Sequence, residues 1–198
     1  MINNIMSKKD TNTTADFLPW EEMRALVVAL YRDGDYIFSL LIACGSYLGL
    51  RISDLKMLTW GDLLHREYLE ITERKTGKLR KFRINEACQE HIVRCWTTLG
   101  RPNTEMHCFI SRKKTIYSTQ RINTRLKEIK RDYHLSLEKF STHSFRKTYG
   151  RRVVEIAVEN DEVALVNLSE FFNHSSIDAT RKYLGLQCGE GNRPGSQF

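Results

Sequence analysis

The stretch STHSFRKTYG, residues 141–150, carries the strongest local signal in this chain of 198 residues. Ser141 and Thr142 are good N-terminal caps, and the pattern after them predicts a helix running to about Glu159. His143 and Arg146 are three residues apart at the start of that helix, so their side chains share one face. The backbone N–H groups of a helix N-terminus also favour a nearby anion. This spacing is common by chance, so the pair indicates a functional site only in combination with other segments of the chain.

Three further segments place polar side chains at breaks between predicted helices. Upstream, GSYLGLRISDLKMLTWGDL (45–63) puts Arg51 at the head of a short helix, directly after a Gly-Leu break. Downstream, LSEFFNHSSIDATRKYLG (168–185) puts His174 nine residues before Tyr183. Lys75 lies 24 residues after Arg51, in the turn of a predicted basic hairpin.

The remaining pattern predicts a mainly α fold with a small antiparallel β-sheet (α+β). Apolar residues at helical spacing predict helices over 20–32, 36–47, 52–58, 86–99, 119–133, 141–159 and 163–172, with a last short helix carrying Tyr183. The period changes over residues 68–84, where two alternating runs flank a turn at 73–77 and predict a hairpin with one buried and one basic face. We divide the chain into a flexible tail (1–17), one domain (18–187) and a second tail (188–198).

Composition excludes several classes of protein. The chain is 41% hydrophobic and 10% aromatic, which is not typical of a disordered protein. No run approaches the roughly 20 apolar residues of a membrane-spanning helix. The N-terminal residues contain no apolar signal core. The five cysteines are irregularly spaced without a C-x-x-C motif, which argues against a disulfide framework or a zinc site and suits a reducing compartment.

The net charge of +7 is concentrated in three clusters, over residues 74–83, 112–131 and 146–152. Such clusters can be ordinary solvated faces, but three of them separated by apolar helices favour a surface that follows a phosphate backbone. The candidate DNA-binding residues are Arg74, Lys78, Arg80, Lys81, Lys113, Lys114, Arg121, Arg125 and Lys147.

Together, the segments around Arg51, Lys75, His143 and Tyr183 resemble the catalytic domain of the tyrosine recombinases. This is the lambda-integrase-like phage integrase family, which shares its catalytic fold with type IB topoisomerases. The resemblance covers residues 18 to 187 and includes the order and spacing of six positions. The catalytic residues that it implies are Arg51, Lys75, His143, Arg146, His174 and Tyr183.

The resemblance implies a role for each of these groups. Tyr183 attacks a DNA phosphodiester and forms a 3′-phosphotyrosyl link. Arg51 and Arg146 hold the non-bridging phosphate oxygens. His143 assists proton transfer at the nucleophile and His174 hydrogen-bonds the phosphate, while Lys75 protonates the leaving 5′-oxygen. No cofactor and no metal is implied. The implied partner is double-stranded DNA, bound by four protomers on two sites, with a monomer or weak oligomer in the absence of DNA. The implied location is the bacterial cytoplasm, at the nucleoid, and no membrane is involved. Residues 184–188 are candidates for contact with a neighbouring protomer.

Departures from the family pattern concern local geometry. Asn173 stands where the family usually has Gly, and Asn tolerates the left-handed conformation that such a turn needs. Phe145 replaces a usual Leu, and the stretch from Arg146 to His174 is a few residues longer than typical. Only about 17 polar residues precede the predicted domain, whereas typical members have a separate DNA-binding domain there. The chain is therefore either a short member, like the fimbrial inversion recombinases, or a fragment.

Two alternative functions and one alternative residue remain open at this point. A DNA-binding accessory or regulatory protein would use the same basic surfaces without cleavage, and a relaxing topoisomerase would use the same chemistry as a monomer. Lys78, three residues after Lys75, is the alternative general acid. Taken singly, Arg51 could instead cap a helix C-terminus or pair with Asp54, and Tyr183 could be a core residue. The sequence does not specify the DNA target, or whether the outcome is integration, excision or inversion.

Overall fold

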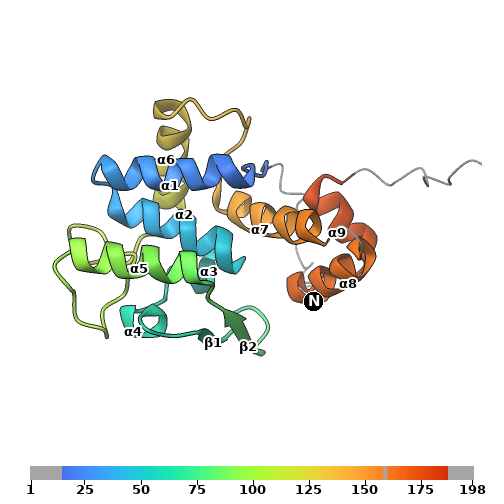
Figure 1. The fold of residues 1–198 in the computed structure, drawn as a ribbon, viewed down its shortest axis with the longest axis horizontal. Coiled ribbons are helices and arrows are strands. Elements are labelled where there is room, and N and C mark those ends of the chain that lie inside the picture. Colours follow the sequence, from blue (N-terminus) through green and yellow to red (C-terminus); the bar gives the residue numbers. More distant parts are fainter. Residues whose placement is uncertain (1–14, 158–159, 187–198) are drawn as a thin grey trace, which may run out of the picture.

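The computed structural model describes residues 15–157 and 160–186, which form a mainly helical fold with one antiparallel hairpin at its edge (Figure 1). In chain order these elements are α1 (Trp20–Arg32), α2 (Tyr36–Leu48), α3 (Ile52–Leu55), α4 (Trp60–Leu63), β1 (Tyr68–Thr72), β2 (Leu79–Arg83), α5 (Glu86–Thr98), α6 (Thr119–Asp132), α7 (Thr142–Ile156), α8 (Asp161–Phe172) and α9 (Ile177–Leu184). The predicted α+β class, mainly helical with a small antiparallel sheet, is confirmed.

Helix α2 forms the centre of the main core. Its residues are buried from Phe38 to Ser46, as expected for a helix that is apolar on most faces. Helices α1, α5 and α7 pack against it, and Figure 1 shows α2 between α1 and α5. The helix ends at Gly49, whose φ of 61° is the left-handed conformation that favours glycine. This turn delivers Arg51 to the start of α3.

The hairpin of β1 and β2 follows the predicted alternation. Leu69 pairs with Phe82 and Ile71 pairs with Arg80, so these four side chains share the inner face. Leu69 and Phe82 are buried there. Arg80 therefore lies on the apolar face of the hairpin, whereas Lys81 is exposed on the other face.

Some predicted boundaries differ from the structure. The short helix after Arg51 ends at Leu55, and Thr59 caps a separate helix, α4, through a reciprocal capping box with Asp62. Helix α7 ends at Ile156, earlier than predicted. Helix α8 begins at Asp161 instead of residue 163, because the acidic side chains of Asp161 and Glu162 interact favourably with the positive end of the helix dipole.

Helices α8 and α9 form a second, smaller core beyond α7 (Figure 1). Its buried residues are Leu165, Leu168, Phe172 and Leu184. Between the two helices, Asn173 has a φ of 55°, so the left-handed turn expected at this position is present. The turn leads directly into His174.

Residues 15–17, which the sequence assigns to the tail, are held against the body. The Oδ2 atom of Asp16 accepts hydrogen bonds of 2.9 Å from the backbone N–H groups of Glu138 and Lys139. The guanidinium of Arg151 lies 4.4 Å from the centre of the Phe17 ring. The rest of that predicted tail (1–14), part of the predicted long connection (158–159) and the predicted C-terminal segment (187–198, with part of the contact segment 184–188) lie outside the described residues.

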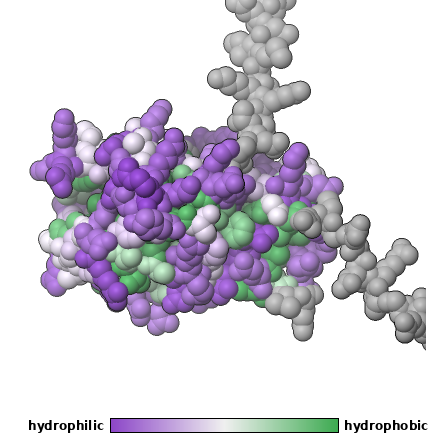
Figure 2. Space-filling view, turned by 90° about the horizontal axis from the view of Figure 1, so that it is seen from above, coloured by the Kyte–Doolittle hydropathy of each residue, from purple (hydrophilic) through white to green (hydrophobic). Residues whose placement is uncertain are grey.

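The surface is mixed in character. Figure 2 shows hydrophilic side chains over much of the face drawn, with apolar residues gathered in separate areas between them. Exposed apolar side chains include Val28 on α1 and Val163 on α8. No helix among the described residues is both long and apolar enough to span a lipid bilayer.

Candidate active site

Arg146 on α7 is the buried arginine of the site. Its residue is 7% exposed, and its two terminal nitrogens donate to the carbonyl oxygens of Gly49 (2.6 Å) and Phe171 (3.4 Å). Burial, and after it the nearby charge of Arg51, lowers the pKa of Arg146 to about 10. A guanidinium with this pKa still carries its charge at pH 7. The fold therefore keeps a positive charge in a poorly solvated position.

Arg51 comes from a different part of the chain and meets the same region. It occupies the N-cap position of α3 with an extended backbone. One terminal nitrogen donates to Glu73 Oε1 at 2.7 Å, and the other donates to the carbonyl oxygen of Phe172 at 3.0 Å. Its ion-pair partner is thus Glu73, and the alternative pairing with Asp54 is wrong. Asp54 instead accepts a hydrogen bond from the backbone N–H of Arg74.

Three arginines converge on the carboxyl end of α8. The carbonyl oxygens of Glu170, Phe171 and Phe172 accept hydrogen bonds from Arg80 (3.2 Å), Arg146 and Arg51. The last carbonyls of a helix have no partner within the helix and carry partial negative charge. Helix α8 has no basic residue in its own last turn, so the positive charge at this end comes from other elements. These contacts join β2, α7 and the α2–α3 turn to the segment that carries His174.

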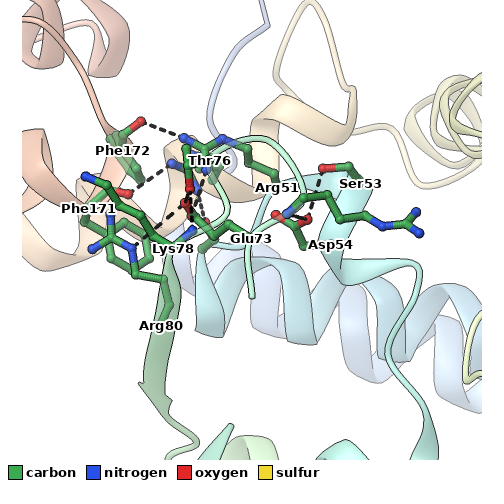
Figure 3. Close-up of polar contacts among 12 residues, drawn as sticks. Arg51, Ser53, Asp54, Glu73, Thr76, Lys78, Arg80, Phe171 and Phe172 are labelled. Carbon is green, nitrogen blue, oxygen red and sulfur yellow. Dashed lines mark hydrogen bonds and ion pairs between the residues drawn. The ribbon is translucent and has the colours of Figure 1, made fainter. Parts of the chain in front are cut away.

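Glu73 is the buried acid among these arginines. It is 3% exposed, at the beginning of the hairpin turn. It accepts from Arg51 and, through Oε2, from the hydroxyl of Thr76 at 2.6 Å, while Arg80 Nε lies 3.9 Å from Oε2. Figure 3 shows the Glu73 carboxylate among these three partners. Sequence reasoning missed this residue, although an acid directly before a run of basic residues was the available signal.

Tyr183 on α9 presents its hydroxyl to the interior. The oxygen is buried and has no hydrogen-bond partner within residues 15–157 and 160–186. The ring lies 5.0 Å from that of His174 and 5.4 Å from that of Phe172, between ring centres, and Lys147 Nζ lies 5.2 Å from the Tyr183 ring centre. Burial raises the pKa of Tyr183 to about 12, although the charges of Arg146 and Arg51 lower it. The two arginines are thus electrostatic neighbours of this phenol.

The two histidines have different surroundings. His174 follows the left-handed Asn173, and its Nδ1 is 3.0 Å from the hydroxyl oxygen of Thr180, which orients the ring. His143 is in the first turn of α7. Partial burial and then the charges of Arg146 and Lys147 lower the pKa of His143 below its usual value, so the imidazole is neutral at pH 7. A neutral imidazole can accept a proton.

Lys75 lies in the hairpin turn and is exposed, as is Lys78. Among the described residues, neither side chain makes a hydrogen bond or an ion pair. Thr76 lies between them and contacts Glu73, so the turn is attached to Arg51 through a single carboxylate. The structure thus brings Arg51, Arg146, His174 and Tyr183 together and holds the lysine-bearing turn beside Arg51.

The predicted DNA-binding residues separate into two groups. The exposed ones are Arg74, Lys78, Lys81, Lys113, Lys114 and Arg121. The partly buried ones face protein groups: Arg80 contacts α8, Lys147 lies over Tyr183, and Arg125 pairs with Asp35 at 2.9 Å and with Glu128 at 3.1 Å. Two of the exposed ones also have acidic neighbours, with Lys81 at 3.1 Å from Glu70 and Arg121 at 3.8 Å from Glu128.

Comparison with known protein families gives a match over most of the chain. Residues 17–188 match the model of the phage integrase family. The probable integrase/recombinase YoeC of Bacillus subtilis (strain 168) is 30% identical over 137 residues, which cover 69% of this chain and 71% of that protein. A probable integrase/recombinase of Acholeplasma phage L2 is 26% identical over 137 residues, which cover 69% of this chain and 44% of that protein.

Solved structures with the same fold are also recombinases. The crystal structure of XerA recombinase has a TM-score of 0.68 at 19% identity and covers 87% of this chain and 61% of the other. A post-cleavage complex of the XerH site-specific recombinase with its difH substrate has a TM-score of 0.64 at 16% identity, covering 90% and 52%. A lambda integrase dimer bound to a core site has a TM-score of 0.62 at 17% identity, and the match covers 92% of this chain and 51% of the other. This chain thus spans only part of the length of those proteins. From the sequence match and the shared fold together, the chain belongs to the phage integrase family and contains a tyrosine recombinase catalytic domain.

Proposed function

We propose that this chain cleaves and rejoins duplex DNA at a specific site through a 3′-phosphotyrosyl intermediate, in DNA integration, excision or inversion. One observation carries the proposal: Arg51 and Arg146, from distant segments, converge on the carboxyl end of α8, where the Phe172 ring lies 5.4 Å from the ring of Tyr183, whose hydroxyl is buried. The names of the related proteins, both described as integrase/recombinase, support it.

The two arginines can bind a phosphate without giving up their present contacts. A guanidinium has five N–H donors. The hydrogen bonds described above, to Glu73, Gly49 and the end of α8, use two of those donors on each arginine. The other N–H donors of each guanidinium are available to the non-bridging oxygens of the DNA phosphate, where negative charge increases in the transition state. The existing bonds fix the direction of each guanidinium, which reduces the ordering needed when DNA binds.

In the proposed cleavage step, the Tyr183 oxygen forms a bond to phosphorus and the bond from phosphorus to the 5′-oxygen breaks. At a pKa of about 12 only about one phenol in 10⁵ is ionised at pH 7, so the nucleophile needs a base. Neutral His143 accepts the phenol proton, and Lys75 (or Lys78) gives a proton to the leaving 5′-oxygen. Rejoining is the reverse: a 5′-hydroxyl attacks the phosphotyrosine, so no external energy source is consumed.

DNA is the proposed partner. The structural relatives include complexes of XerH with its difH substrate and of lambda integrase with a core site, which supports this assignment. The exposed lysines and arginines supply contacts to phosphates that do not depend on sequence. We propose that four protomers assemble on two DNA sites. Exchange between two duplexes requires the cleavage of four strands, one by each protomer.

The test captures the covalent intermediate. A pool of nicked duplexes with randomised sequence is incubated with the protein, and adducts that survive detergent are isolated and sequenced. We expect an adduct with wild type and none with Tyr183→Phe. Tyr149→Phe, which removes another phenol oxygen on α7, is the matched control and retains the adduct.

Other results would contradict the proposal in identifiable ways. DNA binding without any adduct would indicate an accessory or regulatory protein. Relaxation of supercoiled plasmid regardless of sequence would indicate a topoisomerase. An adduct that persists in Tyr183→Phe would show that another residue is the nucleophile.

A further inference from the structure

We propose that Glu73 is a positioning residue for the reaction: its buried carboxylate orients Arg51 and, with Arg80, ties the lysine-bearing turn to the carboxyl end of α8. This inference rests on the proposed function. It concerns a residue that would contact neither the phosphate nor the phenol. The Glu73 carboxylate has three polar contacts, with Arg51, Thr76 and Arg80 (Figure 3).

A negative charge beside a phosphate-binding arginine has an electrostatic cost. It repels the DNA backbone and weakens the field that Arg51 presents to a phosphate. Burying a carboxylate is itself unfavourable unless it is paired and hydrogen-bonded. At 3% exposure Glu73 is paired with Arg51 at 2.7 Å and accepts from Thr76 at 2.6 Å. A group that opposes binding and is nevertheless held this firmly fits a role in orientation.

The hydrogen bonds show which groups Glu73 orients. Arg51 is held at both ends of its guanidinium, by Glu73 on one side and by the Phe172 carbonyl on the other. These bonds set the plane of the guanidinium. The same carboxylate holds Thr76, the neighbour of Lys75 in the turn. One side chain therefore relates the phosphate-binding arginine to the turn that supplies the general acid.

Arg80 extends this connection to α8. Its Nε is 3.9 Å from Glu73 Oε2, and its terminal nitrogen donates to the Glu170 carbonyl at 3.2 Å. Its place on the inner face of the hairpin, opposite Ile71, explains why it points this way. Glu170 lies four residues before His174, so the contact fixes the end of the helix from which that histidine emerges. Arg80 thus stabilises both the acid and the helix end.

The experiment uses a duplex identified by the adduct assay and measures the single-turnover rate of cleavage and the dissociation constant for DNA separately. We expect Glu73→Gln to slow cleavage by about 10- to 100-fold, the effect of a misplacement of about 1 Å. We expect DNA affinity to be unchanged or higher, because a charge that repels phosphate is removed. Glu70→Gln is the matched control on the same hairpin, where an exposed ion pair with Lys81 is lost and cleavage is retained.

A double-mutant cycle separates positioning from general stability. Because Glu73 acts partly through Arg51, Glu73→Gln will slow the Arg51→Ala variant by a smaller factor than it slows the wild-type protein. Glu73→Asp keeps the charge but is one methylene shorter, so it should fold like wild type and still cleave more slowly. If Glu73→Gln does not fold, the cleavage rate of Glu73→Asp tests the inference.

Three results would overturn the inference: a wild-type cleavage rate in folded Glu73→Gln, a wild-type rate in Glu73→Asp, or the same fold-loss from Glu73→Gln with and without Arg51. These results are distinct from failure of the proposed function, which would be the absence of any Tyr183-dependent adduct with the wild-type protein.

Discussion

The phenol of Tyr183 experiences two opposing effects. Burial removes water from the hydroxyl and raises its pKa to about 12, while Arg146 and Arg51 favour the ionised form. Burial is the larger effect in the DNA-free protein. A phosphate that enters beside the two arginines brings negative charge of its own, so proton removal depends on a base and not on the arginines alone. His143, whose pKa is lowered, is the base that we propose for this step.

The protonation of His143 gives a prediction for pH dependence. Because its pKa is below the ordinary value of about 6.5, the neutral, proton-accepting form predominates at pH 7. Single-turnover cleavage should decrease as the pH falls through this pKa and level off above it. His143→Asn should be slow and lack that acidic decline. An unchanged acidic decline in His143→Asn would assign it to another group.

The identity of the general acid can be decided with a modified substrate. Lys75→Ala should slow cleavage by about 100-fold or more while leaving DNA binding largely intact. A 5′-bridging phosphorothiolate has a sulfur leaving group that needs no proton, so it should restore the rate of this variant. Lys78→Ala is the matched variant, three residues away in the same turn. If sulfur rescues Lys78→Ala and not Lys75→Ala, the assignment to Lys75 is wrong.

At the scale of the elements, the carboxyl end of α8 is the organising feature. A helix end with unpaired carbonyls attracts cations, and here it binds arginines from β2, α7 and the α2–α3 turn. Arg146 also binds the carbonyl of Gly49, at the carboxyl end of α2. Two helix ends thus hold the two arginines that we propose bind the phosphate, and each helix end depends on a residue with positive φ.

Gly49 allows a test of one helix end. At a φ of 61° any side chain is strained, and a Cβ added here would come within 2.5 Å of the Tyr149 ring. Gly34 has a φ of 83° with nothing within 4 Å of an added Cβ, so Gly34→Ala measures the strain alone. We expect Gly34→Ala to lower the free energy of unfolding by about 1–2 kcal/mol. Gly49→Ala should lower it more, and should also slow cleavage because Arg146 loses its anchor.

The measurement is denaturant unfolding of both variants, with single-turnover cleavage as the second readout. Equal losses of stability in the two variants would show that the ring of Tyr149 moves aside at no cost. A wild-type cleavage rate in folded Gly49→Ala would show that the Gly49 carbonyl does not control Arg146.

At the scale of the whole molecule, the chain has two hydrophobic cores of unequal size. The larger is centred on α2. The smaller contains Leu165, Leu168, Phe172 and Leu184 and is joined to the larger by α7 and by the arginine contacts. Tyr183, the proposed nucleophile, and His174 are attached to the smaller core, while Arg51 and the lysine-bearing turn are attached to the larger one. The candidate active site is therefore assembled at the junction of the two.

This division predicts unequal local stability. A small core opens at lower free energy than a large one, so amides of α8 and α9 should exchange with solvent faster than those of α2. Bound DNA should slow exchange in α8 and α9 because a phosphate would join the arginines to Tyr183. Hydrogen exchange followed by mass spectrometry measures both effects. Equal protection of α2 and α9 without DNA would show that the two cores unfold as one unit.

Much of the fold could be predicted from the sequence. The apolar period locates the helices, the change of period locates the hairpin, and the cap residues locate several helix ends. These signals are local, since each depends on residues within a few positions. The boundaries that differ, such as the end of the helix after Arg51, are places where short segments with weak periodicity depend on neighbours for their structure.

The six proposed catalytic positions came from the resemblance of the sequence to the tyrosine recombinases, which matches their order and spacing. Sequence alone determined which helix ends carry Arg51, His143, Arg146 and Tyr183, because caps, turns and spacing are properties of the chain. Only the tertiary structure decided how they are held. The binding of three arginines to the end of α8, the pairing of Arg51 with Glu73 instead of Asp54, and the inward direction of Arg80 depend on contacts between residues distant in sequence. The physical reason is that a buried charge takes its partner from whatever the packing brings within hydrogen-bond distance, and sequence spacing does not encode that distance.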